Sequence, residues 1–212
     1  MFTGIVQGLC TVAAVHTEPN LTRFRIDLAE LASGVQLGAS VAVNGTCLTV
    51  TNVEGAEVGF DVIAETLSLT NLGAVAVGDR VNVERSLKFG DEVGGHILSG
   101  HVSDRVRLAR VEEAANERRL FFAVPHGWMK YLHHKGFVAL DGASLTIASV
   151  DASNGEISVA LIPETIARTT LGYRAVGDMV NLEVDAQTQS IVDTVERVLG
   201  SPDWQKRLQI GD

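Results

Sequence analysis

Short runs rich in valine, isoleucine and threonine recur along the first part of the chain, and glycine, asparagine or aspartate separates them. Runs of this kind between turn-forming residues predict strands rather than helices. We expect strands at Gly4–Val15, Arg23–Leu28, Ser40–Val43, Thr46–Val53, Glu57–Ile63 and Arg80–Glu84. The connections are too short for crossover helices, so the pattern predicts an all-β barrel or sandwich with antiparallel strands.

The apolar period changes after residue 185. Ile191, Val192, Val195, Val198 and Leu199 recur at the spacing of one helix face, which predicts a C-terminal helix. Two interpretations of this apolar face stay open: it lies back on its own domain, or it pairs with copies of itself in an oligomer. The tail after Leu199 receives no assignment beyond an expected mobility.

A repeat runs through the chain. Sliding the sequence by 99 residues aligns Ala64–Glu84 with Pro163–Glu183, and 12 of these 21 positions are identical. Each copy predicts a short helix, a glycine stop and then a strand at Val-Gly-Asp-x-Val-Asn. An offset of 97 aligns VNGTCLTV with LDGASLTI, and an offset of 96 aligns TGIV with SGHV. Three blocks in one order indicate a duplicated domain.

The boundary between the copies falls in the glycine-rich stretch Gly90–Gly95. We therefore expect units at residues 1–93 and 94–186, followed by a helix and tail at 187–212. Each unit of about ninety residues is marginal on its own, because small domains bury a smaller share of their surface. Packing of one half on the other, or on another subunit, would compensate.

Composition narrows the class of protein. The net charge of −9 disfavours nonspecific binding to nucleic acid or to anionic membranes. No run of about 18 apolar residues is present, so no membrane span is expected. The start of the chain lacks the features of a secretion signal, and the two cysteines have neither disulfide-framework nor metal-ligand spacing. We expect a cytoplasmic protein without a metal site.

The two halves differ where chemistry is expected. The repeat places Cys47 opposite Ser144, Asn44 opposite Asp141, and Ile5 opposite His101. The second half thus carries more acid–base groups, which predicts two related binding sites with divided roles. Structural alternatives stay open, because free cysteines are often buried, Asp-Gly is a common turn pair, and glycines flank His101. A hydrolase triad is disfavoured because no G-x-S-x-G elbow occurs.

Several long motifs stand in one order along nearly the whole chain: MFTGIVQG, VNGTCLTV, VNVERSLKFGDEVGGHILSGHV, MKYLHHKGFVALDGASLTI, LIPETIARTTLG and VNLEVDAQTQSIVDTVERVL. From Met1 to about Leu199 the sequence resembles the riboflavin synthase family of the metal-free, trimeric type. The resemblance implies two tandem, pseudo-symmetric, six-stranded antiparallel Greek-key barrels and a C-terminal helix that gathers three chains. It also implies that the active site forms between barrels of neighbouring subunits.

The activity implied by the resemblance is a transfer of four carbons between two molecules of 6,7-dimethyl-8-ribityllumazine. The products are riboflavin and 5-amino-6-ribitylamino-2,4-pyrimidinedione, and neither metal nor cofactor is required. The enzyme must hold two flat rings together and move protons. The implied partners are two further copies of the chain and, in some relatives, the lumazine synthase assembly.

The resemblance also carries residue roles. We expect His101 to shuttle protons, and Ser40 or Cys47 to act as nucleophile or to orient water. Phe2 would pack at the same junction. The expected substrate-binding residues are Phe2, Gly4, Ile5, Val6, Thr49, Ala64, Thr66, Lys135, Asp141, Ser144, Thr146, Ile162, Thr165 and Asp185.

The alternative function is a non-enzymatic protein that binds a lumazine or flavin as a chromophore. Such proteins share the duplicated fold, but they look monomeric and lose catalytic groups in one half. A flavin-dependent oxidoreductase is disfavoured, because the chain has neither room nor a glycine fingerprint for a nucleotide-binding domain.

Overall fold

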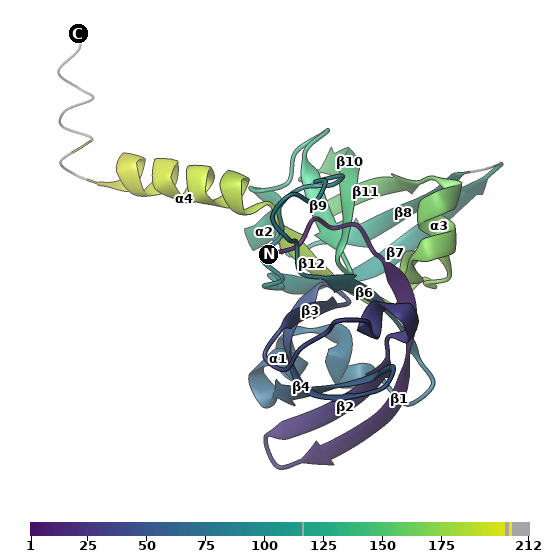
Figure 1. Ribbon diagram of the computed structural model, residues 1–212. Coiled ribbons are helices and arrows are strands. Elements are labelled where there is room, and N and C mark those ends of the chain that lie inside the picture. Colours follow the sequence, from purple (N-terminus) through teal and green to yellow (C-terminus); the bar gives the residue numbers. More distant parts are fainter. Residues whose placement is uncertain (116, 202–203, 205–212) are drawn as a thin grey trace, which may run out of the picture.

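The computed structural model describes residues 1–115, 117–201 and 204, which fold into two closed barrels and a C-terminal helix (Figure 1). The first barrel contains β1 (Gly8–Glu18), β2 (Leu21–Asp27), β3 (Ser40–Val43), β4 (Thr46–Glu54), β5 (Glu57–Ile63) and β6 (Arg80–Arg85). The second contains β7 (Asp104–Ala114), β8 (Glu117–Ala123), β9 (Phe137–Leu140), β10 (Ala143–Asp151), β11 (Glu156–Leu161) and β12 (Met179–Val184). We call them the N-barrel and the C-barrel.

Both barrels close in the same order. The N-barrel runs β1-β2-β5-β4-β3-β6, and the C-barrel runs β7-β8-β11-β10-β9-β12 around the same ring. All strand pairs are antiparallel, and β6 lies between β1 and β3. This topology confirms the predicted pair of six-stranded Greek-key barrels.

Alternation of side chains builds each barrel interior. In β2, Thr22, Phe24 and Ile26 are buried while the residues between them are exposed. A bulge shifts the register of β1 between Val12 and Ala14, and β7 repeats it between Leu108 and Arg110. Bulges bend a strand and increase its twist, so these paired irregularities help each sheet to close.

The predicted helix-and-glycine segments are confirmed in both halves. The helices are α1 (Ala64–Leu69) and α3 (Pro163–Arg168), and each leads into a 3₁₀ turn, Asn71–Ala74 or Thr170–Gly172. A Cβ added at Gly73 would lie 2.6 Å from the Leu67 carbonyl oxygen. Only glycine permits that close return of the chain onto the helix. Further short elements are a 3₁₀ turn at Ala29–Ala32 and α2 at His126–Met129.

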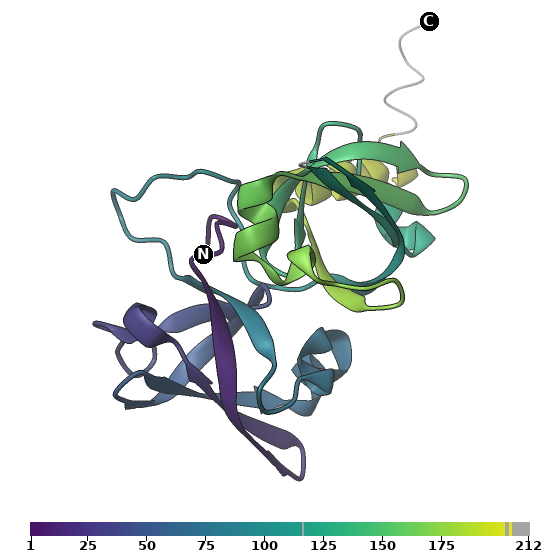
Figure 2. The same cartoon turned by 90° about the vertical axis from the view of Figure 1, so that its right-hand side faces the viewer.

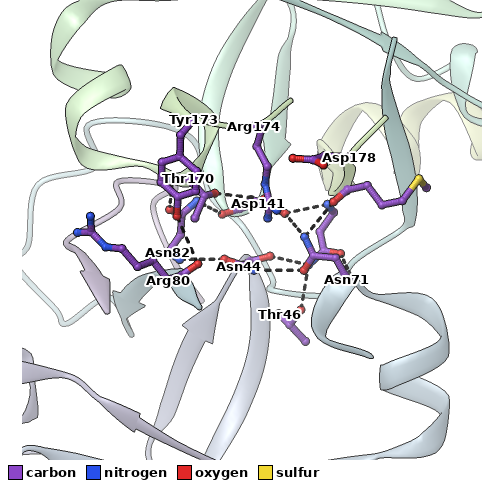
Figure 3. Close-up of polar contacts among 12 residues, drawn as sticks. Asn44, Thr46, Asn71, Arg80, Asn82, Asp141, Thr170, Tyr173, Arg174 and Asp178 are labelled. Carbon is purple, nitrogen blue, oxygen red and sulfur yellow. Dashed lines mark hydrogen bonds and ion pairs between the residues drawn. The ribbon is translucent and has the colours of Figure 1, made fainter. Parts of the chain in front are cut away.

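A polar seam joins the barrels (Figure 3). The β3–β4 turn carries Asn44 and the β9–β10 turn carries Asp141, both in the left-handed region with φ of 45° and 46°. Asn82 Nδ2 donates to the Asp141 carbonyl at 2.8 Å, and Asn181 Nδ2 donates to the Asn44 carbonyl at 2.8 Å. Because each barrel makes the same bond to the other, an approximate two-fold axis relates the two barrels. The bonds therefore fix the orientation of one barrel relative to the other.

The Asp141 carboxylate adds an asymmetric element to this seam. It accepts from Asn71 Nδ2 at 2.7 Å, from Arg174 Nη2 at 2.8 Å and from the Asn181 N–H at 2.9 Å. Asp141 has 0% exposure, so the charge is satisfied wholly inside the protein.

The first predicted strand begins too early, because β1 starts at Gly8 rather than Gly4. The preceding residues cross to the C-barrel, where the Gly4 carbonyl accepts from the Ser144 N–H at 2.8 Å. Phe2 pairs with Leu98 in an isolated bridge. Figure 2 shows the N-terminus between the two barrels, away from the sheet that β1 enters.

The predicted C-terminal helix is α4 (Ala186–Gly200), and Asp185 caps it by accepting from the Thr188 N–H at 2.7 Å. Val192 packs on the C-barrel core, whereas Ile191, Val195 and Leu199 are 64%, 50% and 54% exposed. The apolar stripe is therefore divided between the barrel and the surface. Within the described chain no helix has the length and apolarity to cross a membrane. Of the tail after Leu199, Gly200 ends α4, and residues 202–203 and 205–212 lie outside the described residues, so the expected mobility stays a prediction.

The expected domain limits of 1–93, 94–186 and 187–212 stay a prediction.

Candidate functional site

Each barrel carries a pocket beside its short helix. The N-pocket, about 200 Å³, is lined by Thr46, Cys47, Glu65, Thr66, Leu69, Thr70, Gly100, His101 and Val102. The C-pocket, about 410 Å³, is lined by Gly4, Ile5, Val6, Gln7, Ala143, Ser144, Glu164, Thr165, Arg168 and Thr169. Every lining residue of the N-pocket has its repeat counterpart in the C-pocket, so the two are copies of one site.

Each pocket is completed by a segment from the other half of the chain. Residues 100–102 precede β7 yet line the N-pocket, where the Gly100 carbonyl accepts from the Cys47 N–H at 2.8 Å. Residues 4–7 precede β1 yet line the C-pocket, and Gly4 accepts there from the Ser144 N–H. A Cβ added at Gly100 would lie 2.6 Å from Cys47 Cβ, so glycine is required for this approach.

A buried glutamate holds each crossing segment. Glu84 accepts from the Thr3 N–H at 2.6 Å, the Thr3 hydroxyl at 2.8 Å and the Gly4 N–H at 3.0 Å. Burial raises the pKa of Glu84, and these donors act in the opposite direction. Glu183 holds the other segment in the same way, through Ser99 and Gly100.

The two pockets differ in their reactive groups. The N-pocket contains the half-buried thiol of Cys47 and the exposed imidazole of His101. The corresponding places in the C-pocket hold Ser144 and Ile5. Among the residues that line the two pockets, an imidazole therefore occurs in the N-pocket alone.

His96 adds a second difference, on the C-pocket side. Its Nδ1 lies 2.6 Å from Ser144 Oγ, and its ring stacks on Phe137 with centroids 5.0 Å apart. Burial lowers the pKa of His96, while the charge of Asp185 acts in the opposite direction. Within the described residues, His96 Nε2 has no hydrogen-bond partner.

Several predicted site residues come together in these pockets. Cys47, Thr66 and His101 share the N-pocket. Gly4, Ile5, Val6, Ser144 and Thr165 share the C-pocket. Their roles in binding or catalysis stay predictions.

Other predicted residues lie outside the pocket linings: Phe2, Ser40, Thr49, Ala64, Lys135, Asp141, Thr146, Ile162 and Asp185. Ser40 pairs with Thr49, two residues from Cys47, so all three share the outer face of β3 and β4. Thr146 is related to Ser144 in the same way on β10. Ser40 and Thr49 thus lie next to the N-pocket on the outer face of its barrel, and Thr146 lies next to the C-pocket in the same way.

Three of these residues have other surroundings. Phe2 is buried in a small apolar cluster with Ala42, Leu98 and Ala139, against which Cys47 packs. Asp141 is enclosed in the seam and has no surface for a ligand. Asp185 caps α4.

Reasoning from the sequence missed four groups: Glu65 and Glu164, Thr70 and Thr169, the glutamates Glu84 and Glu183, and His96. The first three pairs are identical in both halves of the repeat, and that identity is a signal that would have identified them. No signal marked His96, because its contact with Ser144 spans 48 residues.

A larger cavity of about 620 Å³ lies between the N-terminal segment and the linker between the barrels. It is lined by Arg85, Lys88, Asp91 and Glu92 among others. The linker occurs once in the chain, so this cavity has no counterpart, and the duplicated pockets remain the candidate site.

Comparison with known proteins agrees with the paired pockets. The model of the lumazine binding domain matches residues 3–86 and 99–185. Riboflavin synthase of Escherichia coli (strain K12) is 48% identical over 203 residues, which cover 95% of this chain and 94% of that protein. The chain belongs to the riboflavin synthase family.

Other members of this family agree in length and similarity. Riboflavin synthase of Chlamydia pneumoniae is 44% identical over 202 residues, covering 95% of this chain and 98% of that protein. Among solved structures, LumP complexed with 6,7-dimethyl-8-(1'-D-ribityl) lumazine superimposes with a TM-score of 0.79 at 23% identity. The superposition covers 87% of this chain and 99% of LumP, and it supports the fold alone.

Proposed function

We propose that this protein is a riboflavin synthase, a transferase that converts two 6,7-dimethyl-8-ribityllumazine molecules into riboflavin and 5-amino-6-ribitylamino-2,4-pyrimidinedione. The observation that carries the proposal is the pair of homologous pockets with different reactive groups. A dismutation needs two sites for one compound, and it needs them to act differently. Membership of the family supports the same reaction.

The proposed chemistry uses the acidity of the lumazine 7-methyl group, whose anion is delocalised into the ring. His101 moves this proton, and Cys47 or Ser40 adds to the other ring or orients a water that does so. The carbanion then attacks the activated ring, and a four-carbon unit passes from donor to acceptor. No atom is gained or lost overall, since the two products together contain the atoms of two substrates.

Binding is assigned to the pocket walls. One lumazine is held in the C-pocket by Gly4, Ile5, Val6, Ser144 and Thr165. The other is held in the N-pocket by Thr66, together with Cys47 and Thr49 on the outer face of β4. Lys135, Thr146 and Ile162 are exposed close to the C-pocket strands and reach the ribityl chain from outside it. Ala64, Asp185 and Phe2 act through the backbone that they support.

The pockets of one chain belong to different barrels, so we propose that the working site joins the N-pocket of one subunit to the C-pocket of the next. The exposed stripe Ile191, Val195 and Leu199 on α4 supports a homotrimer, because three such helices would cover these side chains. The cytoplasmic location follows from the composition, and association with lumazine synthase is carried over from the family resemblance.

The deciding experiment is incubation of the pure protein with 6,7-dimethyl-8-ribityllumazine, without added metal or cofactor. Riboflavin formed at half the molar loss of lumazine is the expected result. Tight, stoichiometric binding without product would overturn the proposal in favour of a chromophore-binding protein.

Variants then test the residue roles. His101→Gln should bind lumazine but turn over at least about 100-fold more slowly, because general acid–base catalysis contributes that much or more. Full turnover in both Cys47→Ala and Ser40→Ala would remove both as nucleophile candidates.

A further inference from the structure

Glu183 is separated from the N-pocket by one short segment of chain. Its carboxylate, 6% exposed, accepts from the Ser99 N–H at 2.7 Å, the Ser99 hydroxyl at 2.8 Å and the Gly100 N–H at 3.1 Å. The Ser99 hydroxyl oxygen accepts in turn from the His101 N–H at 3.0 Å. A continuous chain of hydrogen bonds therefore runs from Glu183 to the backbone of His101.

The charge of this carboxylate matters to the arrangement. Three donors converge on it, and a protonated carboxyl group would have to present one hydrogen to them in place of a lone pair. Burial raises the pKa of Glu183, while the bonds from Ser99 and Gly100 and the charge of His101 lower it. Burial has the larger effect, so the pKa of Glu183 is raised overall, and the converging donors offset part of that rise.

The first half of the chain provides a natural control. Glu84 makes the same three bonds to Thr3 and Gly4, and the Ile5 N–H lies 3.4 Å from the Thr3 hydroxyl oxygen. The two glutamates are similarly buried, with exposures of 4% for Glu84 and 6% for Glu183, and they hold equivalent segments. The two segments differ in the side chain that they place in the pocket, which is the apolar sec-butyl group of Ile5 in one and the imidazole of His101 in the other.

We propose that Glu183 is a positioning residue of the reaction, which acts from the C-barrel through Ser99 to hold the His101 imidazole in the N-pocket. The inference rests on the proposed function of His101. It assigns to Glu84 a different task, that of shaping the wall of the C-pocket.

The test compares Glu183→Gln with Glu84→Gln. Glutamine keeps the size of the side chain but removes one acceptor and the charge. The two variants therefore lose the same interactions at equivalent positions. In Glu183→Gln we expect kcat to fall about tenfold or more, because a displaced base loses part of its contribution, while KM changes little. In Glu84→Gln we expect KM to rise and kcat to change less than about threefold, because Ile5 contributes packing only.

A double variant distinguishes a positioning role of Glu183 from a general loss of folded structure. If Glu183 acts through His101, then Glu183→Gln should have no further effect on kcat in a His101→Gln background. Multiplied effects in the double variant would overturn the proposal, as would equal losses of kcat in the two glutamate variants. Ser99→Ala, which interrupts the link but leaves the buried carboxylate, should reproduce a smaller loss if Glu183→Gln fails to fold.

Amide hydrogen exchange gives a readout that does not depend on turnover. Glu183→Gln should accelerate exchange at residues 99–101 and leave residues 3–5 protected, and Glu84→Gln should do the reverse. Unchanged protection at 99–101 would overturn the positioning role even if the wild type makes riboflavin. Absence of riboflavin from the wild type would instead defeat the proposed function, and the exchange data would still decide whether Glu183 holds His101.

Discussion

Arg174 Nη2 donates to Asp141 Oδ2 at 2.8 Å inside the seam between the barrels, where the first half of the repeat has Val75 and Asn44. The Asp141 side chain is fully buried and that of Arg174 is 21% exposed. One copy of the duplicated surface thus carries a charged pair, and the other copy is neutral. The seam joins two surfaces that are related but no longer interchangeable.

Asp141→Asn should destabilise the protein by about 3 kcal/mol, because it leaves the Arg174 guanidinium without its counter-charge in a largely buried place. Adding Arg174→Leu should restore part of this loss by removing the unpaired charge. Urea unfolding of the wild type and of the three variants measures the coupling. If the losses in unfolding free energy of the two single variants add up to that of the double variant, the two side chains do not interact.

Gly100→Ala should reduce both stability and turnover. Gly100 has φ of +79°, and a Cβ there would lie 2.6 Å from Cys47 Cβ and 2.9 Å from Phe2 Cε2. Gly78→Ala is the matched control, because its φ is +90° but nothing lies within 4 Å of the added Cβ. The backbone penalty of about 1 kcal/mol is common to both, and overpacking adds about 1–3 kcal/mol at Gly100 alone. Equal unfolding free energies, with equal kcat, would contradict the close approach.

The free energy of unfolding should fall as the pH is lowered, because His96 is buried in its neutral form. Burial lowers the pKa of this imidazole from its ordinary value of 6.5, so below that pH the unfolded chain binds a proton that the folded protein does not. The stabilisation that comes from keeping His96 neutral is fully present above pH 6.5. It is lost as the pH falls toward the lowered pKa of His96 in the folded protein. In denaturant unfolding from pH 8 to pH 5, the wild type should lose stability relative to His96→Asn. A constant difference between the two curves would show that His96 does not titrate in this window.

Val195→Glu should dissociate the proposed trimer. Val195 is half exposed on α4, and a carboxylate there would be buried without a partner between three helices, at a cost of several kcal/mol. Ser190→Glu adds the same charge on the opposite side of the same helix, where the residue is exposed, and should leave the assembly intact. Sedimentation velocity distinguishes the species. A monomeric wild type, or a trimeric Val195→Glu protein, would contradict the proposed use of this stripe.

Much of the fold was predictable because the duplication and the alternation in strands such as β2 are local patterns. The start of β1 was not, since the partners of residues 2–4 are Glu84, Leu98 and Ser144, far along the chain. No periodicity within a short window can report that a segment crosses to another barrel.

The candidate site was predictable to the extent that the two halves could be compared. Cys47 with Ser144 and Ile5 with His101 were found as differences, and each pair occupies equivalent places in the two pockets. Asp141 was also found as a difference, yet the sequence could not distinguish a turn and an interface residue from a ligand contact. That distinction depends on burial, which arises from the packing of the barrels on each other.

The crossed N-terminal segment has a consequence for synthesis of the chain. A polypeptide leaves the ribosome N-terminus first, and the N-barrel strands end at Arg85. The bridge partner of Phe2 is Leu98, and the residue that binds Gly4 is Ser144, so neither exists when the N-barrel strands emerge. Glu84 is already present and can bind Thr3 and Gly4, but the contacts of Phe2 and Gly4 with the second half of the chain form only later. The C-pocket is completed by a segment that must wait for more than half of the protein to be translated.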